Sequence, residues 1–241
     1  METLSFLETV LARGGQYCAF AAKPDGPKKQ KFYPTIDRML HAALELDYSG
    51  HDAYFGLAAF GDTGKREAAN ALYMRSLFID LDCGPTKDYP DASTALVALR
   101  KFCTDTHMPR PIMVSSGYGV HVYWPFDADE AVSDWKPVAL ALKRTCAAHG
   151  LYIDTNVTAD AARILRVPGT QNRKRGTTAR VVIQTHPAED GRGDGLRADR
   201  ACGQRAGRYR GAALAGGAVD HEVLCRWGQG RPFCVAGSPR V

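Results

Sequence analysis

The stretch Leu77-Phe78-Ile79-Asp80-Leu81-Asp82-Cys83 is an apolar run interrupted by two aspartates one residue apart. In a β-strand, side chains i and i+2 lie on the same face, so the two carboxylates would stand side by side. Two carboxylates held close repel each other unless a cation lies between them, and their oxygens suit Mg²⁺ or Mn²⁺. The stretch therefore predicts a cation site or, read alone, the end of a strand that turns at Asp82-Cys83-Gly84-Pro85.

The composition of the chain is that of an ordinary globular protein, with 45% apolar and 24% charged residues among 241. The formal net charge of +5 leans basic, which suits an anionic partner such as nucleic acid. Seven cysteines without a Cys-x-x-Cys pair argue against a zinc ribbon and a disulfide framework. Because the sequence shows neither a signal-peptide pattern nor a long apolar run, we expect a cytoplasmic protein that does not span a membrane.

The first 75 residues predict an N-terminal αβ module. Apolar spacing predicts helices over 4–11 and 36–46 and strands over 17–22 and 52–60. The lysine-rich segment 23–31 predicts a turn, which is either a solvated hairpin tip, the reading we favour, or a phosphate-contacting loop. The sequence Gly61-Asp-Thr-Gly64-Lys65-Arg66 lacks the spacing and the hydroxyl of a Walker loop, so we expect an ordinary loop before a helix-like segment over 67–72.

From Leu77 onward the patterns predict strand, helix, strand, strand, helix, strand. After the opening strand they give a helix from Asp91 or Ser93 to Cys103, strands over 112–115 and 120–124, a helix over 132–148 and a strand over 151–154. This βαββαβ order predicts an α+β fold with an RRM-like core over 76–185. In that topology the first and third strands are adjacent, which would bring Asp80, Asp82 and His121 together, with Asp154 on the fourth strand.

Basic residues gather in the segment 163–180. They include Arg163 and Arg166, three residues apart, and the run Arg173-Lys174-Arg175 beside Asn172. Such density near the aspartates suits a polyphosphate, and the alternative is a solvated basic loop. One last strand is expected over 181–183. Residues 186–241 hold eleven glycines and nine arginines but no lysine, which predicts a disordered or loosely packed tail after a domain over 1–185.

Three separated pieces of the chain together resemble the archaeo-eukaryotic primase superfamily, especially the primase-polymerases of phages, plasmids and mobile elements. The pieces are Asp80-x-Asp82, the hairpin Ser116-Gly117-Tyr118-Gly119-Val120-His121, and Asp154 followed by 160–174. The resemblance covers roughly residues 50 to 185. It implies a DNA primase or polymerase domain that makes or extends primers, with an RRM-like catalytic core.

The resemblance also implies the catalytic residues. Asp80, Asp82 and Asp154 would bind two divalent ions, Mg²⁺ or Mn²⁺, for an in-line nucleotidyl transfer. Asp160 is a rival for the third carboxylate, but in this superfamily the ligand is the aspartate that ends an apolar strand, which favours Asp154.

A nucleotide-binding site is implied by the same resemblance. His121 would contact the phosphates of the incoming nucleotide, while Arg163 and Arg166 would clamp the triphosphate or the template backbone. Many members carry a serine two residues before the histidine, where this chain has Gly119, so only backbone N–H groups or Ser116 remain as donors there. The expected nucleotide-binding residues are Ser116, Gly117, Gly119, His121, Arg163, Arg166, Asn172 and Lys174.

We expect single-stranded DNA and nucleoside triphosphates as partners. A helicase would have to lie on another protein or on a longer version of this chain, because no Walker loop occurs here. The alternative function is a noncatalytic replication-initiator module that binds single-stranded DNA. Three intact aspartates favour catalysis, because a binding module gains nothing from like charges where phosphates pass. A nicking endonuclease would need a His-apolar-His pair, and His121-Val122-Tyr123 supplies one histidine.

Overall fold

Two antiparallel sheets organise the chain in this computed structural model, which describes residues 1–23, 26, 28–174 and 176–184. The predicted tail over 186–241 lies outside the described residues. The core sheet has the order β11 (Val182–Gln184), β6 (Ile112–Ser115), β7 (Gly119–Ala131), β5 (Ala71–Asp82) and β4 (Ala59–Phe60). The N-terminal sheet has the order β2 (Lys29–Tyr33), β1 (Tyr17–Ala22), β3 (Asp52–Gly56) and β8 (Ile164–Arg166), and β9 (Gln171–Asn172) pairs with β10 (Ala179–Arg180).

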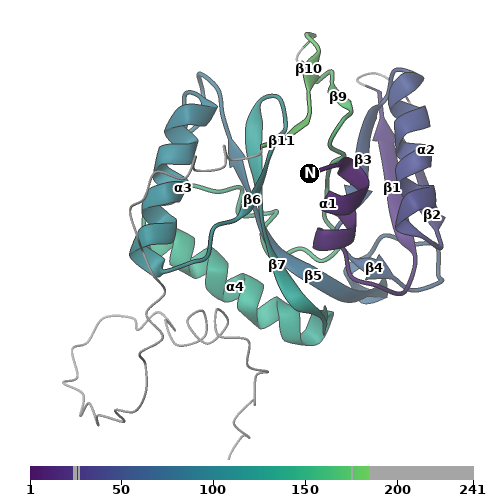
Figure 1. The fold of residues 1–241 in the computed structure, drawn as a ribbon, viewed down its shortest axis with the longest axis horizontal. Coiled ribbons are helices and arrows are strands. Elements are labelled where there is room, and N and C mark those ends of the chain that lie inside the picture. The colour runs from purple at the N-terminus through teal and green to yellow at the C-terminus, as the bar shows by residue number, and fades with distance from the viewer. Residues whose placement is uncertain (24–25, 27, 175, 185–241) are drawn as a thin grey trace, which may run out of the picture.

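Four α-helices and a short 3₁₀ turn, η1 (Ala68–Asn70), are described with these sheets. Helices α3 (Ala92–Thr106) and α4 (Val132–Ala148) cover one side of the core sheet, and α1 (Thr3–Val10) lies between the two sheets (Figure 1). The ring of Phe6 on α1 meets Tyr123 of β7 at 5.2 Å and Phe55 of β3 at 6.2 Å, both edge to face. Helix α2 (Ile36–Tyr48) packs on the N-terminal sheet. None of the described helices has the length and apolarity of a membrane span.

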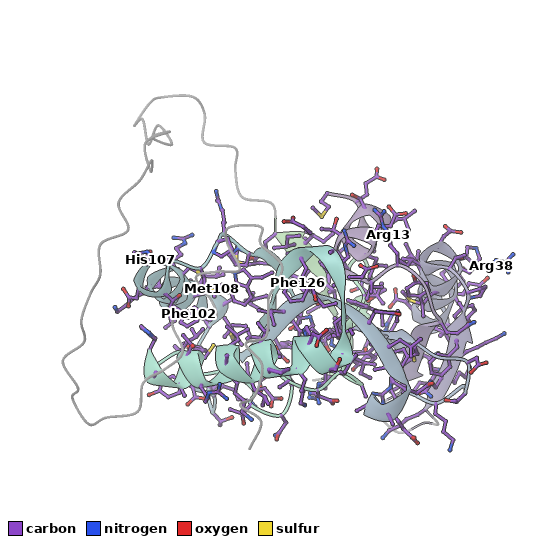
Figure 2. The ribbon with its side chains drawn as sticks, turned by 90° about the horizontal axis from the view of Figure 1, so that it is seen from below. Arg13, Arg38, Phe102, His107, Met108 and Phe126 are labelled. Atoms are coloured by element: carbon purple, nitrogen blue, oxygen red, sulfur yellow. The ribbon has the colours of Figure 1, made fainter. Side chains whose placement is uncertain are left out.

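Local capping explains where two of these helices begin and end. Thr35 caps α2 by accepting from the Arg38 N–H at 3.3 Å, and Asp91 caps α3 by accepting from the Thr94 N–H at 2.8 Å. Helix α3 ends at His107, whose φ of +54° is left-handed. Figure 2 shows His107 and Met108 beside Phe102 at this end of the helix.

The predicted order of the core is confirmed from β5 through α4, and β5 lies next to β7 as the topology requires. The predicted strand over 151–154 is wrong. The Tyr152 N–H donates to the Tyr89 hydroxyl at 2.9 Å, and the Asp154 N–H donates to the Asp80 carbonyl at 2.9 Å. One of these backbone N–H groups bonds to a side chain and the other to β5, so the segment makes no regular strand pairing. It runs beside β5 as a loop.

The two sheets exchange strands across the predicted boundary at residue 75. The predicted strand over 52–60 divides into β3, in the N-terminal sheet, and β4, which pairs with β5 in the core sheet. Strand β8, which the sequence did not predict, comes from the C-terminal part of the chain and pairs with β3. The lysine-rich segment contains the start of β2, and the helix-like segment over 67–72 shortens to η1 because β5 begins at Ala71.

Candidate active site

The pairing of β5 with β7 places Asp80 directly opposite His121, and Asp82 opposite Gly119. Directly opposed residues of an antiparallel pair share a face of the sheet. The Asp80 Oδ1 atom lies 3.9 Å from the His121 Nε2 atom, which is too long for a hydrogen bond. The two aspartates predicted to act together therefore stand on one face, beside the predicted histidine.

Asp154 joins this pair from the loop that follows α4. Its N–H bonds to the Asp80 carbonyl, and its Oδ1 atom accepts from the Asn156 N–H at 2.9 Å. The rival Asp160 makes a similar local contact, since its Oδ1 atom accepts from the Ala162 N–H at 2.9 Å, but its own N–H bonds to the Val157 carbonyl. The backbone bond to Asp80 is therefore what places Asp154 beside the β5 aspartates.

The three carboxylates act on one another electrostatically. Burial, together with the negative charges of Asp82 and Asp154, raises the pKa of Asp80 to about 7 against the opposing effect of Arg163 and Lys174. Excess negative charge therefore surrounds Asp80, and a bound cation would relieve it.

Basic side chains contact the other two carboxylates. The Lys87 Nζ atom lies 2.7 Å from the Asp82 Oδ2 atom, and the Arg163 Nη2 atom lies 3.6 Å from the Asp154 Oδ2 atom. Within the part of the chain that the structure describes, no three His, Cys, Asp or Glu side chains gather closely enough to hold a metal ion. The carboxylate oxygens of the three aspartates are the kind of ligand that a hard divalent ion prefers. To bind such an ion, Asp82 would give up its contact with Lys87 and Asp154 its contact with Arg163.

The glycine hairpin explains why no serine stands before His121. A Cβ atom at Gly119 would lie 2.6 Å from the Leu81 carbonyl oxygen, so β5 approaches β7 too closely for any side chain there. Gly117 has a φ of +92°, and a Cβ atom there would lie 2.7 Å from the Ala179 Cβ atom. Ser116 is buried, and its carbonyl accepts from the Asn172 Nδ2 atom at 2.6 Å, which ties the hairpin to β9.

His121 is neutral in this environment. Burial, together with the positive charges of Arg166 and Arg163, lowers its pKa to about 3 against the opposing effect of Asp82. Its Nδ1 atom is buried and has no partner among the described residues. The hydroxyl of Tyr123, two residues further along β7, is likewise buried and unpaired there.

The two predicted arginines occupy different environments. Arg163 is partly exposed and faces Asp154, whereas Arg166 is 5% exposed and its Nη2 atom donates to the Asp52 Oδ2 atom at 3.1 Å. Over the described residues, the Arg163 Nε atom and the Arg166 Nη1 atom are also buried without partners. Arg166 is therefore held inside the protein rather than presented as a free surface cation.

Known proteins with a similar sequence or structure identify the fold of the chain. No protein-family profile matches the chain. A replication protein of Clostridium perfringens is 32% identical over 144 residues, which are 57% of this chain and 33% of that protein, so the chain spans about a third of that relative. The AEP domain of the cyanophage S-2L primase-polymerase superposes with a TM-score of 0.51 at 19% identity, covering 69% of this chain and 80% of that domain.

The chain has the fold of an archaeo-eukaryotic primase (AEP) domain. The resemblance drawn from the sequence is confirmed at the level of the fold. The crystal structure of primase RepB′ aligns at a TM-score of 0.48 and 13% identity, covering 76% of this chain and 56% of that one.

The predicted site residues come from both sheets, since Asp80, Asp82 and His121 lie on β5 and β7 and Arg166 lies on β8. Sequence reasoning did not find the residues that hold them there. Asp52 pairs with Arg166, Asp47 pairs with Arg173 at 2.6 Å, and Arg66 and Lys136 donate to carbonyls of Ala162 and Ala159 in the loop after Asp154. Each partner lies far away in sequence and belongs to no motif, so only the folded chain reveals the pairing.

Proposed function

We propose that this chain is the catalytic domain of a DNA primase-polymerase, which makes or extends primers by template-directed nucleotidyl transfer. The observation that carries the proposal is the position of Asp80, which lies within electrostatic reach of Asp82 and Asp154 and opposite a buried, neutral His121. The AEP fold and the identity to a replication protein support the same reading. Nucleoside triphosphates are the proposed substrates and single-stranded DNA is the proposed template.

In this proposal Asp80, Asp82 and Asp154 hold two divalent ions, Mg²⁺ or Mn²⁺. When bound, the ions would favour attack by the primer 3′-hydroxyl and stabilise the charge of the leaving pyrophosphate. The excess of negative charge around Asp80 supports such a site, because burial and two like charges disfavour an ionised Asp80 in the absence of a cation.

The phosphates of the nucleotide would lie on the His121 side of the site. A buried donor without a partner is costly, and the His121 Nδ1, Arg163 Nε and Arg166 Nη1 atoms are three polar atoms in this state. Phosphate oxygens would satisfy such donors, and the arginines would neutralise their charge. A neutral imidazole can donate one N–H to a phosphate oxygen, so His121 orients the phosphate without adding charge.

The hairpin and the segment 172–174 complete the proposed nucleotide site. Because Gly119 can carry no side chain, the backbone of the hairpin is left to face the nucleotide, as the sequence predicts. Asn172 joins the hairpin to Lys174, since its Oδ1 atom accepts from the Lys174 N–H at 3.1 Å. The charge of Lys174 acts on Asp80, so this lysine lies within electrostatic reach of the reaction.

The test is primer synthesis and extension on a single-stranded DNA template with Mg²⁺ or Mn²⁺. We expect Asp80→Ala/Asp82→Ala to lose about 10²-fold or more of nucleotide incorporation. Asp105→Ala is the matched control, since Asp105 is an aspartate on α3 whose partner is Lys101, one turn away. Undiminished incorporation by the double variant would refute the assignment. A wild-type protein that binds single strands but incorporates nothing would favour the noncatalytic initiator module.

A further inference from the structure

We propose that Asp52 and Tyr54, on β3 of the N-terminal sheet, position the guanidinium of Arg166 for the triphosphate of the incoming nucleotide. The inference rests on the function proposed above and adds two residues that no motif marks. Both act through Arg166, so they are positioning residues rather than catalytic ones.

The contacts fix the guanidinium from two directions. Tyr54 pairs with Arg166 across β3 and β8, and the centre of the guanidinium lies 4.7 Å from the centroid of the Tyr54 ring. Asp52 accepts from the Nη2 atom at 3.1 Å, and both side chains of this ion pair are only 6% exposed. A planar guanidinium held by a carboxylate at one edge and an aromatic ring on its face has little freedom to turn.

This arrangement leaves one donor of Arg166 unused. The Nη1 atom is buried and, among the residues described, has no hydrogen-bond partner. His121 likewise keeps a buried polar atom without a partner among those residues. We assign both atoms to the side of the site proposed for the phosphates, because phosphate oxygens would satisfy such donors.

Asp52 also holds a second basic element. Its Oδ1 atom accepts from the Arg173 N–H at 2.8 Å, which anchors the chain between Asn172 and Lys174. One carboxylate of the N-terminal sheet thus sets the place of Arg166 and of the segment that carries Lys174.

A purely structural ion pair is the competing explanation. Buried ion pairs that only join two elements can often be replaced by apolar residues without loss of stability. A pair with only this role would not be expected to leave a buried N–H group without a partner, because an unpaired buried N–H is destabilising. The unpaired Nη1 atom is the feature that a joining role leaves unexplained and a phosphate-binding role accounts for.

The test is a double-mutant cycle with Asp52→Asn, Arg166→Met and Asp52→Asn/Arg166→Met. The measurements are KM and kcat for dATP in primer extension, together with Tm. Loss of a charge-assisted hydrogen bond predicts that each single variant raises KM roughly 10- to 100-fold with a much smaller change in kcat. The double variant should keep the KM of Arg166→Met, because asparagine at residue 52 retains an oxygen that can accept from the Arg173 N–H, so that only the effect through Arg166 is removed. Its Tm should recover above that of Asp52→Asn.

Tyr54→Leu and its matched control Tyr54→Phe test the ring independently of the ion pair, and they carry the test if Asp52→Asn does not fold. We expect Tyr54→Leu to raise KM more than Tyr54→Phe does, because phenylalanine keeps the aromatic face and loses only the hydroxyl, which also interacts with Arg166. Unchanged KM in Asp52→Asn and Tyr54→Leu, or additive effects in the cycle, would overturn this inference while wild-type incorporation still supported the proposed function. A wild type that neither binds nor incorporates dATP would overturn both.

Discussion

Asp80→Asn should make the metal-free protein more stable while it abolishes nucleotide incorporation. The side chain of Asp80 is 17% exposed, and its pKa is raised from 3.8 to about 7. Between these values the folded protein binds more protons than the unfolded chain, so the stability of the wild type falls as the pH rises through 7. A shift of about three pKa units corresponds to about 4 kcal/mol at pH 8, and asparagine removes this penalty.

The assay is thermal unfolding at pH 8 and pH 4 in EDTA, repeated with Mn²⁺. At pH 8 in EDTA we expect Asp80→Asn to unfold roughly 8 to 16 °C above wild type, since about 4 kcal/mol shifts the Tm of a domain of this size by about 2 to 4 °C per kcal/mol. At pH 4 the difference should nearly vanish, because Asp80 is then protonated in the folded protein. Mn²⁺ should raise the Tm of wild type, by binding the folded state, and leave that of Asp80→Asn nearly unchanged.

Asp82→Asn is the matched control for this experiment. Asp82 is exposed and its partner Lys87 is exposed too, so its replacement should change stability by less than about 1 kcal/mol in EDTA. The reasoning would be refuted if Asp80→Asn were no more stable than wild type at pH 8, or if its advantage were the same at pH 4.

Three further variants test other parts of the site. Gly119→Ala should lower the free energy of unfolding by about 1 to 3 kcal/mol in chemical denaturation, because the alanine Cβ atom would lie 2.6 Å from the Leu81 carbonyl oxygen. A variant as stable as wild type would contradict the close approach of β5 and β7. Lys87→Ala should change the free energy of unfolding by less than about 1 kcal/mol. It should also lower the Mn²⁺ concentration needed to raise Tm, because the lysine no longer competes with the metal ion for Asp82. A weaker response to Mn²⁺ would argue against this competition. The pKa of His121 is about 3 in the folded protein and 6.5 in the unfolded chain, so the protein loses stability as the pH falls below 6.5, by about 2 kcal/mol at pH 5. His121→Leu should remove this acid sensitivity in urea titrations at pH 7.5 and pH 5. An unchanged pH dependence would show that His121 is not buried in neutral form.

Periodicity predicted helices α3 and α4 because each buries one face, whereas β5 and β7 bury consecutive residues and were predicted as apolar runs. Asp80 and Asp82 could be paired from their spacing alone, since a strand fixes the face of residues two apart. The register that sets Asp80 opposite His121 required the topology as well. The predicted βαββαβ order supplied that topology, in which the first and third strands are adjacent.

Features that depend on distant partners could not be predicted in this way. Strand β8 is three residues long and is identified by its pairing with β3, more than a hundred residues earlier. The loop at Asp154 has an apolar start like that of a strand, yet its donors bond to Tyr89 and to β5. The burial of Arg166 follows from Asp52, so the sequence showed the arginine but not its environment.

The exchange of β4 and β8 between the sheets has a consequence for how this protein can be divided. A cut after residue 75 would run through β5, which would separate its first residues, paired with β4, from β7, and would leave β8 without β3. Each fragment would expose an unpaired strand edge, which invites aggregation. The unit that can be expressed alone, or recombined with other domains during evolution, is therefore the interlocked pair of sheets, and a minimal catalytic core that begins at the first aspartates is not a viable protein.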